Sequence, residues 1–147
     1  MLETYDYTCS ICGYKGAPEN ARYTIHVHEV EEYDFDNLVC HLRKLELVCV
    51  KCHNIHHFKR ALQVLNQEQL IDLAEHFMKV NHCKSEDLMQ CYRIRQKQDM
   101  EFIQQCIENA DARQNRGKRI TFTVHEDVLF HDEIVKQLGK KGLLYLQ

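Results

Sequence analysis

The stretch CVKCHNIHH at residues 49–57 contains a Cys-x-x-Cys pair, and the stretch CSICG at residues 9–13 contains a second one. Because two residues separate the cysteines of each pair, both sulfurs of a pair can turn toward the same metal ion. Two such pairs form a closed tetrahedral zinc site, so the predicted ligands of a structural Zn²⁺ are Cys9, Cys12, Cys49 and Cys52. Residues 13–48 separate the pairs, an insert longer than that of a short zinc ribbon, so this segment is expected to fold. The alternative is that these cysteines are reduced core residues.

Histidines gather at the second pair. If a helix begins there, His53 and His57 stand one turn apart at positions i and i+4, a spacing that lets two imidazoles bind one ion. His56 is then expected to point to a different side. Upstream, residues 22–29 alternate as a strand does, which places His26 and His28 on one face. His28 packed beside the helix completes a predicted three-histidine site with open coordination positions, the arrangement of a catalytic metal.

The chain after residue 65 carries helical signals rather than ligand clusters. Asn66 is a predicted N-cap, and apolar residues recur at helical spacing from Leu70 to Phe77, which predicts a helix over residues 67–80. A second helix is predicted from Ser85 to Ala112, with a break at residues 95–99 left open. A strand over 120–124, a helix over 132–138 and a closing strand over 143–146 follow. We therefore predict an α+β fold, with a zinc-stapled finger at residues 1–65 and a helical extension at residues 66–147.

Length and charge limit the classes of protein that fit. A chain of 147 residues excludes a large multidomain enzyme. The formal net charge of −3 excludes an overall attraction to nucleic acid, so binding a polyanion requires a local basic face. Such a face is predicted around the second cysteine pair, from Arg43, Lys44, Lys51, Lys59 and Arg60. No apolar run approaches the roughly 20 residues that cross a bilayer, and eight cysteines without a signal peptide predict a soluble, cytoplasmic protein.

In combination, the motifs of residues 7–65 resemble those of the HNH endonucleases of the ββα-metal class. The shared order is a Cys-x-x-Cys pair, a strand ending in His28, a second strand, and a Cys-x-x-Cys-His motif with a further histidine four residues on. The resemblance implies two strands and a helix around one divalent cation, Mg²⁺, Mn²⁺, Ni²⁺ or Zn²⁺, with His28, His53 and His57 as its ligands. It also implies metal-dependent hydrolysis of phosphodiester bonds in nucleic acid, with DNA as the expected substrate.

Two positions depart from the pattern of this family. Glu29 stands where the family has its general-base histidine, and Lys44 stands where an asparagine orients that base. A carboxylate with an ordinary pKa of about 4.3 is a weaker base than imidazole unless desolvation raises its pKa. His26, which shares the face of His28, is an alternative base or a fourth ligand. Glu29 and His26 are therefore both predicted as candidate catalytic residues.

Other interpretations of the same residues stay open. The departures at residues 29 and 44 favour a catalytically inactive zinc module that binds nucleic acid or a protein partner, as a regulator or inhibitor. The helices of residues 67–112 could form a homodimer seam through Leu73 and Phe77. The histidines could also form only surface hydrogen bonds, or one of them could replace a cysteine at the zinc. An acidic run at residues 29–36 would repel phosphate, or it is simply a solvated loop.

Overall fold

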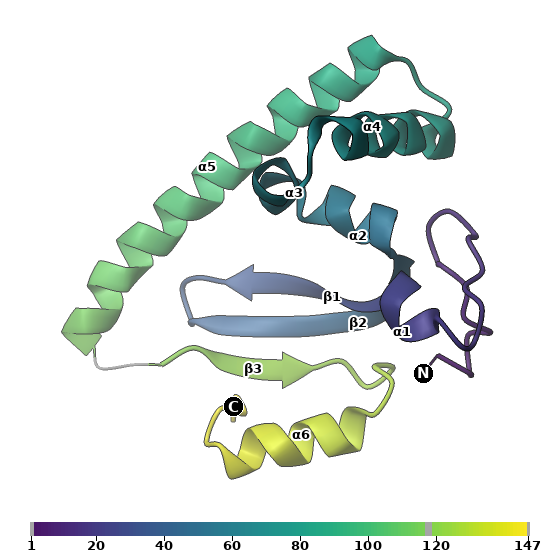
Figure 1. Ribbon diagram of the computed structural model, residues 1–147. Helices are drawn as coiled ribbons and strands as arrows, with labels where there is room; N and C mark the ends of the chain where they lie inside the picture. Colours follow the sequence, from purple (N-terminus) through teal and green to yellow (C-terminus); the bar gives the residue numbers. More distant parts are fainter. Residues whose placement is uncertain (1, 117–118, 147) are drawn as a thin grey trace. The chain divides into compact units, whose positions relative to one another are not determined.

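The computed structural model describes the backbone of residues 2–116 and 119–146 and the side chains of residues 2–109 and 119–146 (Figure 1). Its elements in chain order are α1 (Ala21–Thr24), β1 (Ile25–Asp34), β2 (Val39–Cys49), α2 (Val50–His56), α3 (Phe58–Val64), α4 (Gln67–Asn81), α5 (Ser85–Arg116), β3 (Thr121–Val124) and α6 (His131–Lys140). The three strands form one sheet in the order β1-β2-β3. The mixed α+β class predicted from the sequence is confirmed.

The chain divides into two compact units. Unit 1 comprises residues 1–28 and 46–94, and unit 2 comprises residues 29–45 and 95–147. This division differs from the boundary that the sequence predicts at residue 65. The reason is that α4 packs against α2, which brings residues beyond 65 into the unit that contains the cysteine pairs.

A β-hairpin connects the two cysteine pairs. Strands β1 and β2 are neighbours in the sheet and are joined by the short turn at residues 35–38. The Asp34 carboxylate holds this turn, because it accepts hydrogen bonds from the backbone N–H (3.0 Å) and the side-chain amide (2.7 Å) of Asn37. The predicted strand over residues 22–29 begins three residues later, at Ile25, since residues 21–24 form the helical turn α1. His26 and His28 remain within the strand.

Helix α4 begins and ends where the sequence predicts, within one residue. The Asn66 side chain accepts a hydrogen bond from the backbone N–H of Gln69 (2.9 Å), and the Gln69 side chain accepts one from the backbone N–H of Asn66 (3.0 Å). This reciprocal capping box satisfies two backbone donors at the start of the helix. Leu73, on the apolar face, is only 2% exposed. It is therefore a core residue of the chain, and the proposed dimer seam cannot use it.

Loss of this cap should be measurable. Replacing Asn66 with alanine is expected to lower the free energy of unfolding by about 1 kcal/mol, because the backbone N–H of Gln69 loses its side-chain acceptor. Denaturant unfolding of the metal-loaded protein measures the change. The matched control is Gln67→Ala, at the exposed first residue of the same helix. It should change the free energy of unfolding by less than about 0.5 kcal/mol. Equal effects of the two substitutions would contradict the role of the cap.

Helix α5 runs from Ser85 to Arg116 without the break left open at residues 95–99. The polar segment there is bridged by pairs of opposite charge one turn apart, since Arg95 contacts Asp99 at 3.1 Å and Lys97 contacts Glu101 at 3.8 Å. Such i, i+4 ion pairs stabilise the helix over a stretch where apolar residues no longer recur at helical spacing. Among the residues that the structure describes, no helix is long and apolar enough to cross a membrane.

The C-terminal elements complete unit 2. Strand β3 pairs in parallel with β2, with Val39 opposite Thr121 and Leu42 opposite Val124. Helix α6 covers residues 131–140, slightly longer than the predicted 132–138. The closing strand predicted at residues 143–146 is reduced to a single parallel bridge between Phe122 and Leu144, flanked by two backbone hydrogen bonds of Phe122.

Candidate metal centres

The first cysteine pair lies in a tight turn of the N-terminal loop. The Gly13 N–H donates to the carbonyl of Cys9 (3.1 Å), and the Cys9 N–H donates to the carbonyl of Tyr14 (2.8 Å). Gly13 has a φ of +71°, a left-handed conformation that glycine adopts without steric cost. The residue after the second cysteine of this pair is therefore what allows the chain to reverse, so that both sulfurs face inward.

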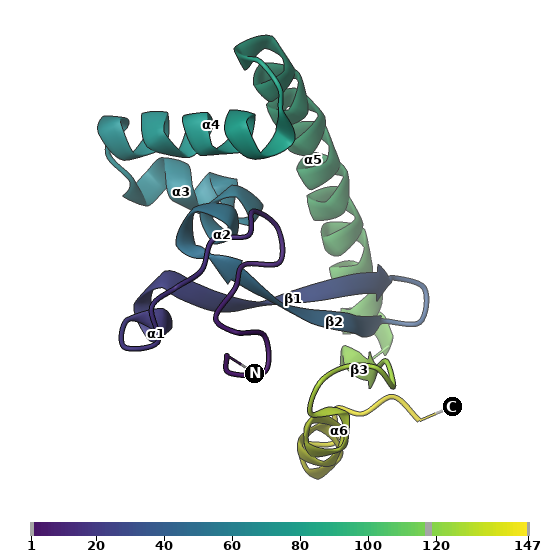
Figure 2. The ribbon, with the colours of Figure 1, turned by 90° about the vertical axis from the view of Figure 1, so that its right-hand side faces the viewer.

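The second pair spans the junction between β2 and α2. Cys49 ends the strand and is the N-cap of the helix, and its sulfur accepts a hydrogen bond from the backbone N–H of Cys52 (3.4 Å). The two pairs are joined through Ser10, whose N–H and hydroxyl both donate to the carbonyl of Leu47 (2.8 and 3.0 Å). In both ribbon views the N-terminal loop lies beside α2 (Figures 1 and 2).

The fold brings all four predicted cysteines together. Their sulfurs lie within 4.8 Å of one another, and the sulfurs of Cys12 and Cys49 are 3.6 Å apart. In a tetrahedral zinc site with Zn–S bonds of about 2.3 Å, neighbouring sulfurs are about 3.8 Å apart. The four thiols are therefore close enough to hold one metal ion, as the two Cys-x-x-Cys pairs predict.

Burial disfavours the charged thiolate forms of Cys12 and Cys52 when no metal is bound. Burial raises the pKa of Cys12 to about 11, and burial together with the neighbouring sulfur of Cys49 raises the pKa of Cys52. At Cys9, burial is outweighed by backbone N–H groups, which lower its pKa to about 7. Cys12 and Cys52 therefore keep their protons until a cation replaces them, and metal binding releases those protons.

A second cluster consists of the three predicted histidines. Donor atoms of His28, His53 and His57 also lie within 4.8 Å of one another. Helix α2 ends at His56, one residue before His57, yet the His57 N–H still donates to the carbonyl of His53 (3.0 Å). That bond preserves the one-turn spacing on which the prediction rests. His28 reaches the pair from β1, with ring centroids 5.8 Å from His53 and 5.2 Å from His57.

One atom of this cluster requires a partner. The Nδ1 atom of His28 is buried and has no hydrogen-bond partner among the described residues. A buried nitrogen without a partner costs about 1–3 kcal/mol. Coordination of a cation is one way to satisfy such an atom, and three imidazoles are a donor set that Zn²⁺, Ni²⁺ and related ions accept. The cluster therefore fits a divalent cation.

Two further histidines flank the cluster. His26 lies next to His53, with ring centroids 4.8 Å apart. His56 stacks on His28 at 4.3 Å, so the expectation that it points to a different side is wrong. The sequence contains a signal for this contact, because His56 and His53 are three residues apart and therefore share a helix face.

Glu29 and Lys44, the two residues that depart from the HNH pattern, lie outside the histidine cluster. Glu29 is exposed, and because consecutive residues of a strand point to opposite faces, its side chain faces away from that of His28. Lys44 is exposed on β2. Of the two predicted catalytic residues, strand geometry therefore favours His26 over Glu29.

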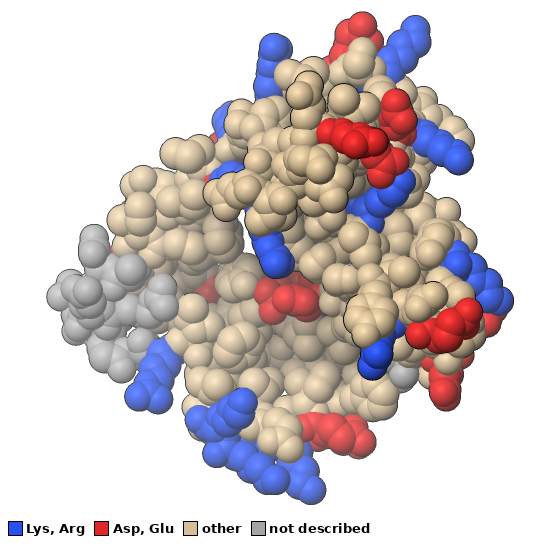
Figure 3. Space-filling model, viewed as in Figure 1, with Lys and Arg blue, Asp and Glu red and all other residues tan. Residues whose placement is uncertain are grey.

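The predicted basic residues do not act as a group of unpaired charges. The Arg43 guanidinium contacts Glu32 at 2.6 Å, and the Lys51 ammonium contacts Asp72 at 2.6 Å. Acidic and basic side chains lie side by side over α4 (Figure 3). Lys44 is exposed on β2, and Lys59 and Arg60 are exposed on α3. To contact phosphate, Arg43 and Lys51 would therefore have to give up these ion pairs.

No known protein family, curated protein or solved structure matches this chain.

Proposed function

We propose that this protein is an HNH-like, metal-dependent nuclease. In this proposal Zn²⁺ at the four cysteines holds the fold, and a second divalent cation at three histidines serves the hydrolysis of phosphodiester bonds in nucleic acid. The observation that carries the proposal is the convergence of His28, His53 and His57 from a strand and a helix. Helix α2 contributes to both clusters, since Cys52 and His53 are consecutive residues.

The two clusters differ in the chemistry they support. Four thiolates close the coordination shell of zinc, which is typical of structural sites, whereas three neutral imidazoles leave positions open for water and substrate. The order of β1, β2 and α2 also agrees with the ββα arrangement that the resemblance implies. His28, His53 and His57 would hold the cation, which when bound would supply Lewis acidity toward a scissile phosphate and its leaving oxygen.

The remaining histidines supply the proton chemistry in this proposal. An imidazole nitrogen of His26 accepts a proton from the attacking water, because His26 lies on the strand face that carries His28. Its contact with the ring of His53, at 4.8 Å between centroids, orients it beside the cluster. Glu29, which stands where the family has its usual base, points to the other face of the strand. In this proposal His26, two residues before the ligand His28, takes the place of that base.

A cleavage assay tests the proposal. Purified protein is incubated with plasmid, linear duplex, single-stranded DNA and RNA, each with Mg²⁺, Mn²⁺, Ni²⁺ or Zn²⁺. We expect cleavage of at least one substrate that depends on the added cation and stops on adding EDTA. Absence of cleavage on every substrate, by a protein shown to be folded and zinc-loaded, would count against the enzyme.

The same samples distinguish the principal alternative. A catalytically inactive zinc module would shift nucleic acid in a gel, or bind a protein partner, without cutting any substrate. The ion pairs of Arg43 and Lys51 favour the protein-binding form of this alternative, because they weaken attraction to phosphate.

A further inference from the structure

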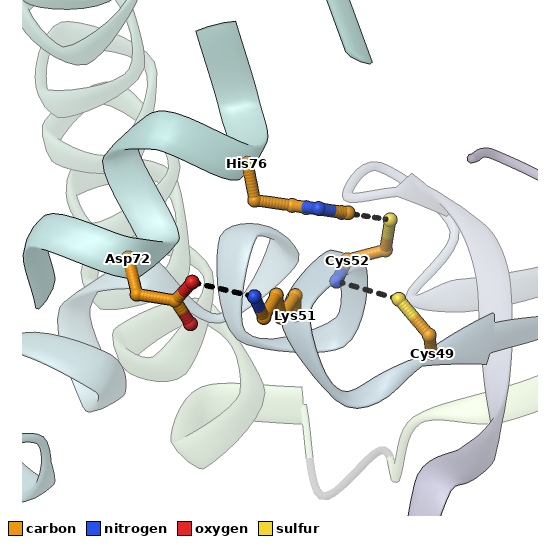
Figure 4. Close-up of polar contacts among 5 residues, drawn as sticks. All are labelled: Cys49, Lys51, Cys52, Asp72 and His76. Atoms are coloured by element: carbon orange, nitrogen blue, oxygen red, sulfur yellow. Dashed lines mark hydrogen bonds and ion pairs between the residues drawn. The ribbon is translucent and has the colours of Figure 1, made fainter. Parts of the chain in front are cut away.

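A histidine from a distant part of the chain lies against the cysteine cluster. His76, on α4, places its Nε2 atom 3.3 Å from the sulfur of Cys52 (Figure 4). It lies outside both Cys-x-x-Cys pairs and outside the histidine-rich segments at residues 26–28 and 53–57. Its position 24 residues after Cys52 follows no known ligand spacing, so the sequence carries no signal for this contact.

The contact is one of a matched pair between α2 and α4. Lys51 and Cys52 are consecutive residues of α2, and their partners on α4, Asp72 and His76, are one helical turn apart. The ammonium of Lys51 contacts the Asp72 carboxylate at 2.6 Å. The ion pair and the His76 contact together hold one face of α4 over the second cysteine pair (Figure 4).

His76 is placed to support a ligand and not to replace one. The group of donor atoms that all lie within 4.8 Å of one another contains the four cysteines and does not include His76. Cys52 is 2% exposed, so water supplies little of the hydrogen bonding that a thiolate needs. Zinc bound by four thiolates carries two surplus negative charges, and N–H donors to the sulfurs disperse that charge.

We propose that His76 is a positioning residue of the cysteine site, whose Nε2–H donates a hydrogen bond to the Cys52 thiolate and thereby couples metal retention to the packing of α4. This role requires the tautomer of His76 that carries its proton on Nε2, because Nε2 is the ring nitrogen that lies against the sulfur of Cys52. The proposal concerns only the cysteine site and is independent of any cleavage activity.

Substitutions at residue 76 test the donor atom directly. The amide nitrogen of glutamine falls near the place of Nε2, so His76→Gln should keep the hydrogen bond. His76→Asn, whose amide is one carbon shorter, and His76→Leu should lose it. We expect zinc to leave the Asn and Leu variants about 10- to 100-fold faster in the presence of a chromogenic chelator. The Gln variant and the control Glu75→Ala, exposed on the same helix, should release zinc as slowly as the unchanged protein.

Cobalt spectroscopy adds a readout that a purely structural role would not change. With Co²⁺ in the cysteine site, the thiolate-to-metal absorption band of the Asn variant should shift while its intensity stays that of four sulfurs. The proposal is overturned if all variants release zinc at the same rate. It is equally overturned if the Gln and Asn variants behave alike, if the intensity reports a lost ligand, or if the chain binds no metal through its thiols. If the Leu variant fails to fold, the comparison of the Gln and Asn variants still tests the proposal, because both of these side chains are polar.

Discussion

Removing the metal from the four cysteines is expected to unfold unit 1. A core cluster of that unit consists of Cys9, Cys49 and Cys52 together with the apolar side chains of Ile25, Leu47 and Val48. Burial of three such apolar side chains contributes about 5–9 kcal/mol, at about 1.5–3 kcal/mol each. A structural zinc site contributes about 10–16 kcal/mol near pH 7. A metal at the four cysteines is therefore expected to contribute more than the apolar burial of this cluster, and without it we expect unit 1 to lose its fold.

Circular dichroism and metal analysis measure this effect. The protein as purified should contain zinc, and a strong chelator should abolish both the zinc signal and the cooperative thermal transition. Cys52→Ala should behave like the chelated protein, whereas Cys91→Ala, at an exposed cysteine of α5 outside the cluster, should keep its zinc and its Tm. A zinc-free chain that melts at the same temperature as the loaded one would refute a metal-dependent fold.

The second large effect is expected at the histidine cluster. His57→Ala should reduce cation-dependent cleavage by about 100-fold or more, because it removes one of three ligands and the remaining pair holds the cation weakly. His57 is exposed and lies between α2 and α3, so its substitution should leave the zinc content and the Tm unchanged. The effect is therefore expected on activity and not on folding.

Cleavage rates and calorimetric titration with Mn²⁺ or Ni²⁺ provide the measurement. The control is His125→Ala, an exposed histidine that follows β3 and belongs to unit 2, which should cleave at the original rate. Full activity in the His57 variant would remove this residue from the site. Loss of activity together with loss of zinc would instead indicate a structural effect, and the assignment of His57 as a catalytic ligand would fail.

Short-range spacing accounts for what the sequence alone determined about this protein. Two residues between cysteines bring both sulfurs to one side of a turn, and the i, i+4 spacing of His53 and His57 brings both rings to one side of a helix. The capping residues of α4 act over the same range. In each case backbone geometry within about one turn decides the outcome, so the geometry of each cysteine pair, the geometry of the His53 and His57 pair, and the limits of α4 follow from local residues.

Contacts between distant segments were decided only by the tertiary structure. His76 reaches Cys52 because α4 packs on α2, and His56 stacks on His28 because β1 lies beside α2. The division into units is likewise set by the packing of α4. Such contacts depend on how whole elements dock, which is determined by the summed burial and hydrogen bonding of many side chains. The spacing of residues along the chain does not reveal that sum. The docking of α4 on α2 is what places His76 against the cysteine cluster.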